Sequence, residues 1–307
     1  MFGIRGKYLK IKILLSLQSR AFNLFLKVIN KKTLFKKRFT HKKIDIFNHS
    51  EPTGRIISSY HVDKYKVNGQ NVFTLRPKEN VSDKHILYLH GGAYVEGFLR
   101  PHWDFMHMLI RETNCIITAP DYPLAPENTY IQSFAMVSSL YTELIGKVKQ
   151  NDLILMGDSS GGGLALALAQ LMRNQNIPQP SQIILLSPWL DISLTNPGIK
   201  DLDPSDLFLN VEGLKLAGKA YAGDESTDFY LLSPVNGPLD GLGKISIFTG
   251  SREILAADAR RLKEKADEEE IEINYYEYPG MFHAWMLINL PESKMARKQI
   301  IDLIRNT

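Results

Sequence analysis

A serine flanked by small residues is the strongest chemical signal in the sequence. Ser159 lies in the pentapeptide Gly157–Gly161 (GDSSG), between the apolar run Leu153–Met156 and the helix-like run Leu164–Leu168. A G-x-S-x-G turn between a strand and a helix holds its central residue in a strained conformation and exposes the serine hydroxyl. Backbone N–H groups at the start of the following helix lie beside that hydroxyl. The pattern therefore predicts a nucleophilic serine.

A nucleophilic serine needs a base that accepts its proton, and a third group must orient that base. In parallel α/β enzymes with this turn, the partners follow in the order serine, acid, histidine. Of the eight histidines, only His283 lies downstream of Ser159. It follows an apolar segment that is typical of a strand, so a loop at the edge of the sheet would carry it. His283 is therefore the predicted base.

The acid should lie in the loop after the preceding strand. Glu253 occupies that place, just beyond the apolar segment 244–250. Asp258, on the helix that follows, is the alternative acid. Glu277 lies inside the last predicted strand and is expected to point away. A structural explanation for Glu253 also stands, because an acidic residue near a helix start is favoured by the helix dipole.

The tetrahedral intermediate of acyl transfer needs N–H donors, each lowering the barrier by about 3 kcal/mol. The segment His90–Ala93 (HGGA) follows the apolar run Ile86–Leu89. Such a loop can aim consecutive amides into the site beside the N–H of Ser160. His90 itself lies upstream of the serine and is expected to brace the loop by hydrogen bonding.

These residues must be positioned by a sheet, and the sequence predicts one. Before it, alternating residues within 55–62 and 72–75 predict two antiparallel strands joined near Asn68–Gly69. Short apolar strands separated by helices are typical of a mostly parallel α/β sheet with helices on both faces. Strands are predicted at 85–90, 114–120, 153–157, 182–187, 244–250 and 272–278, and helices at about 102–113, 131–148, 160–174, 254–270 and 292–305.

The segment 194–238 interrupts this alternation. Its Pro, Gly and acidic residues surround one plausible helix at 211–221. A connection of this length after the serine strand is typical of a lid or cap. The predicted organisation is an N-terminal arm over residues 1–50 and a catalytic domain over residues 51–307, with the cap inserted at about 194–238.

Composition describes an ordinary globular chain of 307 residues, with 44% hydrophobic and 23% charged residues. The single cysteine, Cys115, excludes an intramolecular disulfide framework and indicates a reducing compartment. Because a reducing compartment is indicated, the chain is predicted to be cytoplasmic. The apolar setting of Cys115 predicts that this residue is buried.

The N-terminal arm is strongly basic. Residues 1–43 hold 13 of the 37 Lys and Arg and none of the 33 acidic residues. Interleaved aromatic and leucine residues predict an amphipathic helix, packed on the domain by its apolar stripe or lying on an anionic membrane surface. Nucleic acid is not the expected partner. The apolar stretch Ile13–Leu17 is shorter than the core of a signal peptide, and no window approaches the ~20 apolar residues of a membrane-spanning helix.

Together these motifs resemble the hormone-sensitive lipase-like branch of α/β-hydrolase esterases, which includes bacterial acetyl esterases and lipases. Gly157–Gly162 (GDSSGG) is similar to that branch's G-D-S-A-G-G, and His90–Ala93 is similar to its H-G-G-G. Asp121–Glu127 (DYPLAPE) and Ser187–Asp191 (SPWLD) are similar to D-Y-R-L-A-P-E and S-P-W-x-D. The resemblance runs from about residue 55 to the C-terminus and implies the α/β-hydrolase fold.

The resemblance implies a role for each candidate residue. Ser159 would be the nucleophile, His283 the general base and acid, and Glu253 the third member of the triad. The oxyanion donors would be the N–H groups of Gly92, Ala93 and Ser160, with Gly91 permitting the turn. In this family an N-terminal segment also forms part of a cap over the pocket.

The chain departs from the family pattern at four positions. Ala93 replaces the third glycine, Ser160 replaces alanine and Pro123 replaces arginine. Glu253 stands where aspartate is commoner, which changes the reach of the acid.

The predicted function is that of a serine carboxylesterase that hydrolyses short-chain acyl esters through an acyl-enzyme. No cofactor or metal is predicted, because the sequence has no Walker loop, no suitably placed G-x-G-x-x-G and no zinc-ligand spacing. One alternative is a membrane-surface lipase or deacylase docked by the basic arm. Another is a non-catalytic small-molecule receptor on the same scaffold, which His283 disfavours. The sequence does not determine the oligomeric state, and a homodimer is one of the states that it allows.

Overall fold

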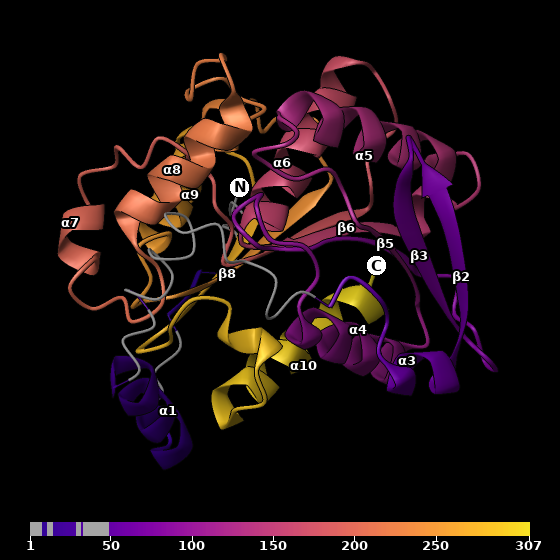
Figure 1. The fold of residues 1–307 in the computed structure, drawn as a ribbon, viewed down its shortest axis with the longest axis horizontal. Helices are drawn as coiled ribbons and strands as arrows, with labels where there is room; N and C mark the ends of the chain where they lie inside the picture. The colour runs from indigo at the N-terminus through magenta and orange to yellow at the C-terminus, as the bar shows by residue number, and fades with distance from the viewer. Residues whose placement is uncertain (1–7, 11–14, 29–31, 33–48) are drawn as a thin grey trace, which may run out of the picture.

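The structure, a computed structural model, describes residues 8–10, 15–28, 32 and 49–307. At its centre is a nine-stranded sheet in the order β1-β9-β8-β7-β6-β4-β5-β3-β2 (Figure 1). Within the described residues, β2 pairs antiparallel with β3 and β3 with β5, and all other neighbours are parallel. The strands are β1 (Tyr8–Lys10), β2 (Tyr60–Val67), β3 (Gln70–Pro77), β4 (His85–Leu89), β5 (Ile116–Pro120), β6 (Leu153–Asp158), β7 (Gln182–Leu186), β8 (Lys244–Gly250) and β9 (Ile273–Tyr278).

Helices cover both faces of this sheet, which confirms the predicted fold class. Figure 1 shows α5 and α6 above the sheet and α4 and α10 below it. The helices are α1 (Leu17–Val28), α3 (Gly54–Ser59), α4 (Arg100–Thr113), α5 (Tyr130–Ile145), α6 (Ser160–Asn174), α7 (Ile199–Leu202), α8 (Val211–Ala222), α9 (Ala256–Glu268) and α10 (Pro291–Arg305), with short 3-10 turns at Gln150–Asp152, Pro234–Asn236 and Trp285–Leu287.

Two hydrophobic cores form because the central strands are covered on both sides. Every residue of β4, β6 and β7 is buried. Successive side chains of a strand point to opposite faces. Leu87 and Leu89 of β4 accordingly join the core under α5 and α6, whereas Ile86 and Tyr88 join the core against α4 and α10. This double burial explains why the strands read as continuous apolar runs.

One predicted strand is wrong in part. Alternation over 55–62 indicates a strand, but residues 54–59 form helix α3 and the strand starts at Tyr60. Only Ile56 is buried in this short helix, while Ile57 is 58% exposed. Six residues with one buried contact carry too little periodicity to separate a helical turn from a strand. The predicted hairpin turn at Asn68–Gly69 is present between β2 and β3.

The segment 194–238 contains α7 and α8 and packs near the serine turn. Buried residues of α8 include Leu214 and Tyr221. The ring of Tyr221 stacks on Tyr94 with centroids 3.8 Å apart and planes 1° apart. Tyr94 follows the HGGA loop directly. The segment thereby forms one wall beside that loop.

The basic arm is described only in part, at β1, α1 and Lys32; residues 1–7, 11–14, 29–31 and 33–48 lie outside the described residues. Strand β1, which the sequence does not predict, pairs parallel with β9 at the edge of the sheet. Helix α1 packs on the domain through Leu26 and Phe22, but the other buried residues of this helix are the polar Ser19 and Asn23. Most of its large apolar side chains are exposed, so the prediction that the arm helix packs by its apolar stripe holds only in part. In the described part of the chain, none of the helices has the length and apolar character needed to cross a membrane.

Candidate active site

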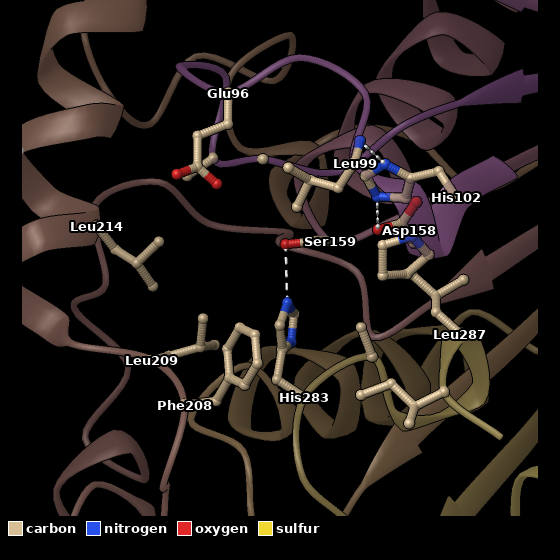
Figure 2. Close-up of a pocket in the computed structure, with 15 residues that line it drawn as sticks. Glu96, Leu99, His102, Asp158, Ser159, Phe208, Leu209, Leu214, His283 and Leu287 are labelled. Carbon is tan, nitrogen blue, oxygen red and sulfur yellow. Dashed lines mark hydrogen bonds and ion pairs between the residues drawn. The ribbon is translucent and has the colours of Figure 1, made fainter. Parts of the chain in front are cut away.

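Ser159 lies on the sharp turn between β6 and α6. Its backbone has φ 53° and ψ −123°, a conformation that costs energy for a residue with a side chain. A Cβ atom on Gly157 would lie 2.2 Å from the carbonyl oxygen of Gly161, and one on Gly161 would lie 2.1 Å from that of Leu89. Strand and helix therefore approach too closely for any side chain at either glycine. The turn projects the serine hydroxyl into a pocket (Figure 2).

His283 joins the serine to an acid. Its Nε2 lies 2.9 Å from Ser159 Oγ, and its Nδ1 lies 2.5 Å from Glu253 Oε2. Figure 2 shows the imidazole below the serine hydroxyl and turned toward it. Burial alone would lower the pKa of His283, but the hydrogen bond and negative charge of Glu253 raise it above its ordinary value of 6.5. An imidazole held in this way can accept a proton from the serine and stabilise the resulting charge.

Glu253 is fixed by three donors on its other oxygen. Oε1 accepts hydrogen bonds from Ser187 Oγ at 2.8 Å, Thr249 Oγ1 at 2.9 Å and the Gly250 N–H at 2.7 Å. The side chain is fully buried. Its orientation toward His283 is therefore set by its surroundings and not by the histidine alone.

The other two carboxylates considered from the sequence have different partners. Asp258 accepts a hydrogen bond from Asn196 Nδ2 at 2.9 Å. Glu277 binds Arg260 at 2.7 Å and Tyr275 at 3.0 Å. Of the three candidates, Glu253 is the one that the structure brings to His283.

The HGGA loop lies beside the serine. Gly92 and Ala93 line the same pocket as Ser159. Gly92 has φ +132°, and a Cβ atom there would lie 2.2 Å from the carbonyl oxygen of Glu96, so only glycine fits. The N–H of Gly91 donates to Asp158 Oδ1 at 3.1 Å and is occupied. This leaves the loop amides of Gly92 and Ala93 as candidate oxyanion donors.

Ser160 contributes its backbone to the site and its side chain to the loop. It is the first residue of α6, so its N–H has no acceptor within the helix. Its hydroxyl accepts the N–H of Tyr94 at 3.3 Å. The side chain thus holds the end of the HGGA loop against the helix start.

His90 braces this loop as the sequence predicts. Its Nδ1 lies 2.8 Å from the carbonyl oxygen of Gly91, and its ring stacks on Tyr122 with centroids 4.3 Å apart. The Tyr122 hydroxyl donates to the His90 carbonyl at 2.6 Å. Complete burial lowers the pKa of His90 to about 3, which keeps the ring neutral. Cys115 is buried as predicted, and burial raises its pKa to about 12.

A buried cluster beneath the serine is not predicted from the sequence. Asp158 accepts a hydrogen bond from Tyr88 Oη at 2.6 Å and faces His102 Nε2 at 3.4 Å. Burial would raise the pKa of Asp158, but His102 and the Tyr88 hydrogen bond hold it below its ordinary value. The serine motif includes Asp158, whereas no local pattern marks His102. Their contact depends on the packing of α4 under the sheet.

Asp206 is a second unpredicted residue, and it joins the 194–238 segment to the acid loop. Its Oδ1 accepts the N–H groups of Phe208 at 2.8 Å and Leu209 at 2.9 Å, and its Oδ2 accepts that of Ile254 at 2.8 Å. The ring of Phe208 lies 5.8 Å from that of His283. Burial outweighs these hydrogen bonds and raises the pKa of Asp206 to about 6.

The pocket in front of Ser159 is small and largely apolar. Its cavity volume is about 120 Å³. Figure 2 shows side chains from the 194–238 segment on one side of the serine and Leu287 on the other. Its lining includes Leu99, Phe208, Leu209, Leu214, Leu287 and the polar Glu96. Such walls favour an apolar group over a charged one.

The strained serine turn, the buried histidine beside it and the covered parallel sheet define an α/β-hydrolase. Residues 86–287 match the family described as alpha/beta hydrolase fold, and the chain belongs to this family. It is similar to an esterase of Acinetobacter venetianus, with 34% identity over 71% of this chain and 73% of that protein. It is also similar to an acetyl-hydrolase of Streptomyces hygroscopicus, with 29% identity over 69% of this chain and 72% of that protein.

Solved structures show the same fold. A hormone-sensitive lipase from a metagenome library superposes with a TM-score of 0.81 over 95% of this chain and 99% of that one. The sequence identity is 23%, so this likeness shows the fold alone. The family match and the esterase relative confirm that the chain belongs among the α/β-hydrolase esterases, as the resemblance implies.

Proposed function

We propose that this protein is a serine carboxylesterase that hydrolyses short-chain acyl esters through an acyl-enzyme. The observation that carries the proposal is the continuous contact from Ser159 Oγ to His283 Nε2 at 2.9 Å and from His283 Nδ1 to Glu253 Oε2 at 2.5 Å. The named relatives, an esterase and an acetyl-hydrolase, support ester hydrolysis. Contact between the base and the nucleophile favours turnover over a receptor that only binds its ligand.

Acylation begins when Ser159 Oγ attacks the ester carbonyl carbon and His283 Nε2 takes the hydroxyl proton. The negative charge moves to the carbonyl oxygen, where the N–H groups of Gly92, Ala93 and Ser160 stabilise it. Collapse of this intermediate breaks the bond to the alcohol oxygen. The imidazolium gives its proton to that oxygen, and the alcohol leaves. Glu253 stabilises the imidazolium throughout.

Deacylation repeats these steps with water. His283 takes a proton from a water molecule that attacks the acyl carbon, and the same backbone donors hold the second oxyanion. The bond to Ser159 Oγ then breaks as His283 returns the proton to it. The products are the carboxylic acid and the free enzyme.

The pocket volume favours a short acyl group. An apolar protein cavity of about 150 Å³ binds benzene, which has six carbons. By that scale the 120 Å³ space beside Ser159 holds an acyl chain of about four to five carbons. Bulky side chains at Phe208, Leu209 and Leu214 line one side of this space.

The test compares two adjacent serines. Ser159→Ala is expected to abolish hydrolysis of a 4-nitrophenyl acetate or butyrate ester, and an organophosphonate should label wild type at Ser159 by mass spectrometry. Ser160→Ala, which removes a hydroxyl that accepts the Tyr94 N–H and keeps the backbone N–H, is the matched control and should retain most activity. Full activity in Ser159→Ala would overturn the mechanism. Equal rates for acyl chains of two and twelve carbons would overturn the chain-length proposal alone.

A further inference from the structure

Helix α1 presents its large apolar side chains to solvent. Figure 1 shows this helix at the margin of the molecule, beyond α10. The exposed fractions are 81% for Leu17, 61% for Leu24, 54% for Phe25 and 74% for Val28. Four such residues on twelve positions form a continuous patch and not a scatter of single exposed side chains.

The helical repeat gathers these residues on one face. At 100° per residue, Leu17, Ala21, Leu24 and Val28 fall within a sector of about 60°, and Phe25 widens it. Arg20 and Lys27 are exposed and lie along one edge of the same sector. We call these seven residues the outer face of α1. An amphipathic helix of a globular protein normally turns such an apolar stripe toward the core.

Specific contacts hold α1 in this orientation. The backbone N–H of Ser16 and the hydroxyl of Ser19 both donate to the carboxylate of Glu292 on α10. The ring of Phe22 stacks on Phe282, next to His283, with centroids 5.2 Å apart. Asn23 is buried on the same inner side. The side of α1 that faces the protein therefore holds the polar Ser19 and Asn23 together with Leu26. The remaining large apolar residues, Leu17, Leu24, Phe25 and Val28, stay outside.

Charge decides which partner suits the outer face. It carries two cations, and neither α1 nor any other residue among 1–43 is acidic. A second copy of this face would offer it no opposite charge. An anionic lipid surface offers both an apolar layer for the leucines and Phe25 and phosphates for Arg20 and Lys27. We propose that the outer face of α1 docks the protein on an anionic membrane surface.

The experiment is sedimentation of the full chain with vesicles, in the absence of any ester. Wild type should bind phosphatidylglycerol-containing vesicles and bind phosphatidylcholine vesicles at least about tenfold more weakly. Leu24→Gln with Phe25→Gln should weaken binding to the anionic vesicles about 100-fold, since it removes most of the apolar contact. Arg20→Gln with Lys27→Gln should weaken it about 30-fold at low salt.

A matched control changes exposed apolar residues elsewhere. Ile131 on α5 and Leu216 on α8 are 59% and 53% exposed. The double variant Ile131→Gln, Leu216→Gln should bind vesicles like wild type. Ser159→Ala should also bind like wild type, which separates this proposal from the proposed esterase activity. Unchanged hydrolysis of a short ester by the α1 variants shows that they are folded.

Three results would overturn the proposal. Equal binding to both kinds of vesicle would show that the partner is not an anionic surface. Binding at the wild-type level by both α1 double variants would show that the outer face is not the docking surface. A wild-type dimer in analytical ultracentrifugation that Leu24→Gln with Phe25→Gln converts to a monomer would assign the face to a second copy of the chain. If those variants fail to fold, Leu17→Gln with Val28→Gln tests the same face.

Discussion

Replacing Glu253 by glutamine tests how the acid controls His283. The two side chains have nearly the same shape, so the change removes the charge and gives one position an NH2 group. Oε1 accepts three hydrogen bonds, from Ser187, Thr249 and the Gly250 N–H. The amide oxygen must therefore take that position, and the NH2 group must face His283 Nδ1. That ring nitrogen then accepts, Nε2 carries the proton, and the imidazole cannot take the proton of Ser159.

The magnitude follows from these contacts. Turning the amide over would lose three hydrogen bonds of about 1 kcal/mol each, which leaves the productive tautomer populated at roughly 1%. Loss of the carboxylate charge beside the imidazolium removes at least another factor of about ten. We expect kcat/KM for a short 4-nitrophenyl ester to fall about 1,000-fold or more, as tautomer-reversing substitutions in serine hydrolases do.

The assay measures kcat/KM at the plateau of the pH profile, with thermal unfolding as a check on the fold. Asp258→Asn, at the alternative acid, is the matched control and should stay within about threefold of wild type, since Asp258 bonds to Asn196 and lies outside this contact chain. A Glu253→Gln variant with a tenth or more of wild-type activity would refute the tautomer argument. Greater loss in Asp258→Asn than in Glu253→Gln would refute the assignment of the acid.

Three further predictions follow from the site. Because Glu253 raises the pKa of His283 above 6.5, kcat/KM should fall on the acid side with a midpoint above pH 6.5, and a midpoint well below this value would contradict the ion pair. Asp206→Asn should move that midpoint to lower pH, since the carboxylate also raises the pKa of His283; a merely structural residue would lower the rate without moving the midpoint. Gly161→Ala should lower the free energy of unfolding in urea by about 1–3 kcal/mol or more, because its Cβ would lie 2.1 Å from the carbonyl oxygen of Leu89. An unchanged urea concentration at half-unfolding would show that the turn relaxes without cost.

The sequence predicts most strongly what local pattern determines. Continuous apolar strands and helix-length spacers predict the sheet because double burial leaves a one-dimensional signature. The serine turn is local at Gly157, where a Cβ atom would meet the carbonyl oxygen of Gly161, although Gly161 itself is required by the close approach of Leu89 on β4. Chain order then limits the base to His283. These inferences need no knowledge of how distant segments pack.

The sequence fails where distant segments meet. Asp158 and His102 come together only because α4 packs beneath the serine turn. Asp206 acquires its role from a backbone N–H 48 residues away, at Ile254. The helix α1 is predicted as an amphipathic segment, but its rotation is set by Glu292 on α10. Amphipathic pattern gives two faces and does not say which one the protein buries.

Ser187 shows how a bracing residue reaches both halves of the site. Its hydroxyl donates to Glu253 Oε1 at 2.8 Å and accepts the Ala284 N–H at 3.1 Å, so one side chain links the acid loop to the loop that carries His283. Ser187 has φ 45°, a strained conformation that places this hydroxyl between the two loops. A glutamate has one more methylene than aspartate and more freedom to lose on burial. The three hydrogen bonds to Oε1 offset this loss of side-chain entropy and hold the longer acid in one rotamer. A glutamate can therefore replace the commoner aspartate here.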